Sequence, residues 1–144
     1  MRQQKSWQSV LLFARFALAA AFLSAVADRL GLWGKMGDTG VSWGDMEHFY
    51  RHTAKLAPWL PASLVPAVAW LVDLLEAALG ICLLLGIQLR RSAWLSAALL
   101  LLFAISMAAF QSVKLSLNFS VLTCSACAYL VYLASVAQAD VQPG

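Results

Sequence analysis

Three ionisable side chains stand inside long apolar runs of the sequence: Arg15, Asp73 and Glu76. A charge at the bilayer centre costs about 2.5 to 3.5 kcal/mol even on a lenient insertion scale, so such residues normally turn away from lipid and pair. If each run is a helix centred in the membrane, Glu76 lies near mid-depth, and Arg15 and Asp73 lie about 4.5 Å to either side of it. We therefore expect Arg15 to pair with Glu76.

The two acids carry the proton chemistry that this group could do. Asp73 and Glu76 are three residues apart, which puts them on adjoining strips of one helix face. With one arginine between two buried acids, like-charge repulsion disfavours joint ionisation, and one acid is expected to carry a proton. Two interpretations stay open: Arg15 and Glu76 lock two helices together, or the group is a ligand or proton site.

A second motif is the C-x-x-C formed by Cys124 and Cys127. On a helix these thiols are neighbours, and the pair could cycle between dithiol and disulfide if one sulfur became a thiolate. Its expected depth is close to that of the two acids, which would place a base nearby. Cysteines also act as small packing residues, which is the competing interpretation and the one we favour for Cys82.

His48 and His52 are four residues apart and would share a helix face, which is half of a metal site. The chain has no other histidine, so thiols or carboxylates would have to complete the site. We therefore predict no metal and expect the two imidazoles to contact headgroups or water.

The composition fixes the surroundings of these residues. Of the 144 residues, 62% are hydrophobic and only 12% are charged, about half the charged fraction of a soluble domain. The net charge of +3 comes from scattered basic residues, which argues against nucleic acid as a partner. Apolar residues form unbroken runs rather than alternating, which excludes a membrane β-barrel. An all-α integral membrane protein, with the lipid bilayer as its partner, remains.

Four runs are long enough to be helices that cross about 30 Å of hydrocarbon. Small residues recur every fourth position in the first and fourth runs, a pattern that lets membrane helices pack closely. A single transmembrane domain, a four-helix bundle over residues 1–144, is predicted. Its spans are expected at 9–27, 64–87, 92–113 and 115–137.

The loop 28–63 between the first two spans is the only long polar stretch. Its residues 45–55 have apolar positions at helical spacing, which predicts a short amphipathic helix at the membrane interface, capping the bundle. Arg29 is assigned to this loop. The Arg90-Arg91 pair in the second turn favours an N-terminus on the inner side. Ala25-Val26-Ala27 looks like a signal-peptide cleavage site, but Arg15 argues against cleavage.

The chain resembles the DoxX family over nearly its whole length. The likeness rests on Arg15, on Gly34-Lys35, and on Glu76, Gly80, Gly86 and Arg90 in the pattern E-x-x-x-G-x-x-x-x-x-G-x-x-x-R, with the run 114–121 in addition. The resemblance implies a four-helix protein of the bacterial inner membrane with both termini cytoplasmic. It also implies association with quinone-dependent oxidation and with redox enzymes.

A second resemblance is architectural. Four spans, a long loop after the first, and C-x-x-C in the fourth resemble vitamin K epoxide reductase-like proteins, which pass thiol electrons to quinone. Those proteins usually have a further cysteine pair in the loop, and this loop has none. A partner's thiols would then be required.

Three functional hypotheses follow. The leading one is a membrane component of a redox system that holds a quinone or another apolar small molecule near Arg15, Asp73 and Glu76. There Arg15 donates to a carbonyl-type oxygen, an acid handles the proton, and Trp70, Asn118 and Tyr50 line the mouth. The alternatives are a non-catalytic scaffold, which anchors a redox-enzyme partner or forms a homo-oligomer, and a quinone-linked thiol oxidoreductase that uses Cys124 and Cys127.

Overall fold

The computed structural model describes the backbone of residues 2–141 and the side chains of residues 7–138. Over this range the chain is helical without a strand, which confirms the all-α prediction. The elements in chain order are α1 (Arg2–Arg29), α2 (Met46–Leu56), the 3-10 turn η1 (Ala62–Leu64), α3 (Val65–Leu85), α4 (Leu89–Phe110), α5 (Val113–Asn118) and α6 (Val121–Val141).

Four helical segments in the described part of the chain are long and apolar enough to cross a membrane. They are Trp7–Arg29, Ala62–Leu85, Leu89–Phe110 and Val121–Gln138. Most of their large apolar side chains are exposed, as expected where lipid rather than water surrounds the protein. The first span runs to Arg29, so Asp28 and Arg29 belong to the helix and not to the loop.

The last span begins later than the sequence predicted. The run expected at 115–137 is broken, because the short α5 ends at Asn118 and Ser120 adopts a left-handed backbone with φ of 55°. Ser112 caps α5 by accepting from the Lys114 amide at 3.1 Å. The Ser116 hydroxyl donates to the carbonyl of Ala104 at 3.1 Å and thereby holds α5 against α4. Hydropathy alone does not register such a break.

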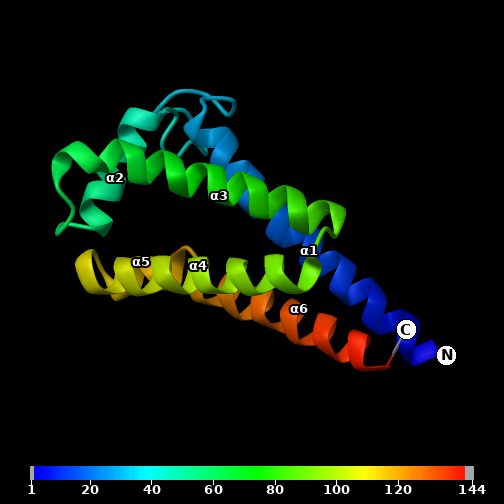
Figure 1. Ribbon diagram of the computed structural model, residues 1–144. Coiled ribbons are helices and arrows are strands. Elements are labelled where there is room, and N and C mark those ends of the chain that lie inside the picture. The colour runs from blue at the N-terminus through cyan, green and yellow to red at the C-terminus, as the bar shows by residue number, and fades with distance from the viewer. Residues whose placement is uncertain (1, 142–144) are drawn as a thin grey trace.

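The spans pack as two helix pairs, α1 with α3 and α4 with α6 (Figure 1). The α4–α6 contact is close, and the Ser125 hydroxyl crosses it to donate to the Ala97 carbonyl at 2.8 Å. Toward the loop end, α3 and α4 diverge in Figure 1, and α2 contacts both of them there. The start of α1 and the end of α6 lie at the opposite end of the bundle.

The α1–α3 pair is tight because of Gly80. A Cβ at this position would stand only 2.9 Å from Leu23 Cγ and 3.3 Å from Phe22 Cβ. Such close approach through a small residue strengthens dispersion contacts between helices in lipid. It also fixes the register of the two antiparallel helices, and that register decides which charges can meet.

Candidate functional site

The charged centre of the protein is Arg29 at the end of α1. Its Nη1 donates to Asp73 Oδ1 at 3.1 Å and also to Glu76 Oε2, and all three side chains are about 96% buried or more. The guanidinium Nε is buried and has no hydrogen-bond acceptor among the described residues. One cation thus holds two carboxyl groups and keeps one donor unused. We call these three residues the Arg29 cluster.

The predicted pair between Arg15 and Glu76 is wrong. Arg15 lies one helix end away, where its Nε donates to the Leu83 carbonyl at 3.2 Å and its guanidinium rests against Gly86. The prediction centred both helices at one depth, but α1 has 28 residues and α3 has 21, so the two midpoints do not coincide. Arg29 is 14 residues, or about 21 Å, further along α1.

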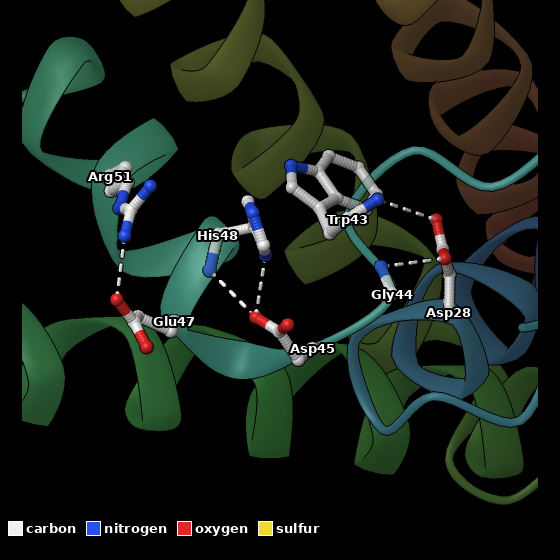
Figure 2. Close-up of polar contacts among 7 residues, drawn as sticks. All are labelled: Asp28, Trp43, Gly44, Asp45, Glu47, His48 and Arg51. Carbon is white, nitrogen blue, oxygen red and sulfur yellow. Dashed lines mark hydrogen bonds and ion pairs between the residues drawn. The ribbon is translucent and has the colours of Figure 1, made fainter. Parts of the chain in front are cut away.

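Two aromatic rings form a roof over the Arg29 cluster. The guanidinium carbon of Arg29 lies 3.8 Å from the ring centroid of Phe49 and 4.9 Å from that of Trp43. These cation–π contacts offset part of the desolvation of the arginine. Phe49 projects from α2, whose first turn is capped by Asp45, the acceptor for the amide of His48 at 2.8 Å. Figure 2 shows this cap and the exposed Glu47–Arg51 pair one turn further on.

Asp28 fastens the loop that carries Trp43. Its carboxylate accepts from the backbone amides of Ser42 at 2.9 Å, Trp43 at 3.3 Å and Gly44 at 3.2 Å, two of which are drawn in Figure 2. Gly44 has φ of 72°, and a Cβ there would collide with the backbone of residues 35 and 36. Consecutive residues therefore do two jobs: Asp28 folds the loop over the bundle, and Arg29 holds the acids beneath it.

The other predicted site residues fall into two groups. Tyr50 and Trp70 do lie together, since the Trp70 indole donates to the Tyr50 hydroxyl at 2.8 Å across the α2–α3 junction. Asn118 is exposed at the end of α5, which packs on α4 and α6 and not on the helices of the Arg29 cluster. The structure therefore gives Asn118 no place at this site.

The thiols occupy a separate part of the bundle. Cys124 and Cys127 are free, partly exposed cysteines of α6 that pack at the edge of the core formed with α1 and α4. No hydrogen bond joins either sulfur to Asp73 or Glu76 in the described residues, and α3 and α6 share no extensive contact there. The expected base beside the dithiol is therefore not found.

His52 belongs to the surroundings of the Arg29 cluster. Its ring stacks on Phe49, with centroids 6.4 Å apart, and meets Trp43 edge-on at 5.7 Å. Burial lowers the pKa of His52 below its ordinary value of 6.5, and the positive charges of Arg29 and Lys55 lower it further. The imidazole is therefore held neutral around pH 7. No group of three or more metal-ligating side chains occurs among residues that the structure describes.

Two cavities stand out, and neither is lined by the acids. One of about 380 Å³ lies between α1 and the loop, with Asp28, Trp33 and Trp43 in its wall. The other, of about 250 Å³, lies at the opposite end beside Arg15. The Arg29 cluster itself is closed by Phe49 and Trp43.

The sequence reasoning missed Arg29, Trp43 and Phe49. One signal could have found Arg29: Asp73 was expected on the loop side of mid-membrane, and Arg29 stands where the first helix reaches that side. The DoxX-like pattern has structural reasons here, since Glu76 binds Arg29, Gly80 admits α1, and Gly86 ends α3 with φ of 75° against Arg15.

The chain belongs to the family of the methylamine utilisation protein MauE, which it matches over residues 7–128. This range includes the four spans down to the first third of α6, the loop and the whole Arg29 cluster. The protein is therefore a multi-pass membrane protein of a redox-related family. Neither curated proteins nor solved structures gave a significant match.

Removal of the shared cation should be more harmful than removal of the whole charged set. Arg29→Gln is expected to lose about 3 to 5 kcal/mol of unfolding free energy, because two carboxyl groups stay buried without their partner. Adding Asp73→Asn and Glu76→Gln should recover most of that loss. Denaturation in detergent micelles measures both, with Arg51→Gln, which breaks an exposed pair, as a control that changes about 0.5 kcal/mol or less. Equal losses in the single and triple variants would contradict the pairing.

His52 should make the protein less stable in mild acid. Its folded pKa is lowered, so its contribution is complete above pH 6.5 and declines as the pH falls from 6.5 through the folded pKa, where the unfolded chain binds the proton more readily. Unfolding curves over this range should show less acid loss in His52→Gln. His48→Gln, at the other end of the same helix, should keep it. An unchanged pH dependence in His52→Gln would refute this assignment.

Proposed function

We propose that the protein is the membrane-embedded component of a redox system and that its Arg29 cluster binds a quinone, or another apolar molecule with a carbonyl-type oxygen. One observation carries the proposal: the buried Nε of Arg29 lacks an acceptor, while Nη1 is shared between two carboxylates. An unmade buried hydrogen bond costs about 1 to 3 kcal/mol. A ligand oxygen at this nitrogen would remove that cost.

The same cluster suits the protons of quinone chemistry. Reduction of a quinone to a quinol adds two electrons and two protons at its oxygens. Asp73 and Glu76 share a single guanidinium, so a proton on either carboxyl group balances the charge of the cluster, and that proton lies beside the proposed oxygen. The electrons have to come from a redox partner protein, which membership of the MauE family supports.

Entry of the ligand would require α2 to move. Phe49 covers the guanidinium, and the α2–α3 junction is held by the hydrogen bond between Tyr50 and Trp70. Trp70 is 41% exposed toward the surroundings, which makes this junction the proposed mouth. Arg15 and Asn118 are outside the proposed site.

We place the protein in a bacterial inner membrane with both termini cytoplasmic. The exposed arginines Arg90 and Arg91 lie in the turn at the end of the bundle where α1 begins, which supports this orientation by the positive-inside rule. The DoxX resemblance supports the same arrangement. In it the Arg29 cluster and α2 face the outer side.

Quinone retained by the purified protein tests the proposal. After extraction of the full chain in a mild detergent, chromatography of the organic extract should show quinone in the native protein and about tenfold less in Glu76→Gln and Asp73→Asn, which remove charge without changing shape. Glu47→Gln, at an exposed carboxylate of α2, is the matched control and should retain quinone.

The competing outcomes are distinct. Circular dichroism and size-exclusion profiles establish that each variant is folded. Folded variants that keep full quinone content, or a native protein that binds none on titration with a short-chain quinone, would remove the binding proposal. Loss of a co-purified partner without any change in quinone would favour a scaffold that anchors a redox enzyme.

A thiol oxidoreductase is the second candidate, because Cys124 and Cys127 are free and one helical turn apart on α6. Oxidation of the pair to a disulfide releases two electrons and two protons, which reduce one quinone to one quinol. If this occurs, adding a short-chain quinone should protect two thiols from alkylation, as seen by intact mass. Cys82→Ala should behave like the native protein. A pair that stays fully alkylated with quinone present would eliminate this function.

A further inference from the structure

The second polar centre of the protein is a cavity beside Arg15, at the opposite end of α1 from the Arg29 cluster. It has a volume of about 250 Å³ and lies between α1, the start of α4 and the last turns of α6. Here α1 and α6 extend past the α3–α4 turn, as Figure 1 shows, and leave a notch beside that turn. The wall is mostly apolar, formed by Leu11, Leu12, Leu89 and Val131.

Arg15 is held in one position within this wall. Its Nε donates to the Leu83 carbonyl, and its terminal Nη2 would lie 2.6 Å from a Cβ at position 86, so only a glycine leaves room for it. Within the described residues, neither terminal nitrogen has a protein acceptor, and no carboxylate pairs with this guanidinium. Two donors of a fixed, permanently charged group are therefore available to a ligand.

The position of the cavity selects the kind of ligand. Arg15 is level with Gly86, where the Ala62–Leu85 span has ended, and the exposed Arg90 and Arg91 lie in the adjoining turn. This is the depth at which phospholipid headgroups meet basic residues. Leu12 is exposed beside the cavity and offers an apolar surface to an acyl chain.

The polar part of the wall fits the rest of a headgroup. Gln8, Ser135 and Gln138 line the cavity together with Arg15, and they supply neutral donors and acceptors without a negative charge. A single cation among neutral polar groups favours a ligand with one negative charge. It gives a zwitterionic headgroup no partner for its ammonium.

From these observations we propose that the Arg15 cavity is a binding site for the phosphate of an anionic phospholipid. The phosphate oxygens accept from the terminal nitrogens of Arg15. Gln8 and Gln138 contact the headgroup, and the acyl chains lie along Leu11 and Leu12. This site is independent of the proposed quinone site and shares no residue with it.

Lipid retention in native mass spectrometry tests the proposal. The full chain, purified in mild detergent and supplied with equal amounts of phosphatidylglycerol and phosphatidylcholine, should retain one phosphatidylglycerol in preference. Arg15→Gln should lower that retention about tenfold, since a charge-assisted hydrogen bond is lost. Arg91→Gln, which changes an exposed arginine outside the cavity, should retain the lipid as the native protein does.

Further arms decide against the other sources of the signal. Ser135→Leu narrows the cavity and leaves Arg15 in place, so it should also lose the lipid and covers the case in which Arg15→Gln does not fold. Displacement of the bound lipid by millimolar inorganic phosphate would show a soluble-anion site and overturn the lipid assignment. Equal retention of both lipids, or full retention in a folded Arg15→Gln, would overturn it as well.

Discussion

One buried guanidinium organises the loop half of this protein. Arg29 ends the first helix inside the structure and binds Asp73 and Glu76 on the second span. Charges are expensive to bury, and such groups remain in place only when geometry and further contacts compensate their desolvation. The tight α1–α3 approach at Gly80 provides that geometry, because it fixes the register that brings the three side chains together.

The loop follows from the same constraint. A charged cluster near the end of a helix pair would be open to water or lipid without a cover, and here the cover is built from the residues around it. Asp28 gathers the amides of residues 42–44, which places Trp43 over the guanidinium. Helix α2 then adds Phe49 and contacts both α3 and α4 where these diverge. The interfacial helix is thus part of the site, and its movement would control access to the site.

The two arginines of the first helix have different surroundings and different proposed partners. Arg29 is enclosed, paired with acids and covered by aromatic rings, which suits a neutral ligand oxygen and proton exchange. Arg15 has no acid, stands beside an apolar wall and is level with the end of a span, which suits an anionic headgroup. About 21 Å of helix separates them, so the protein keeps its redox and lipid chemistry at opposite ends. Membership of the MauE family fits a redox role for the enclosed end.

The sequence by itself determined the solvent and the architecture. Long apolar runs with little charge leave only membrane helices, and the amphipathic spacing of residues 45–55 was enough to place α2. The intramembrane acids were also visible, because a carboxyl group in an apolar run is conspicuous. Tertiary structure alone decided which arginine they bind. Hydropathy gives the length of each span but not the shift of one helix along another, and that shift depends on contacts such as Gly80 against Leu23. The roof of Trp43 and Phe49 was equally hidden, since a long loop can return to a bundle in many ways until Asp28 fastens it.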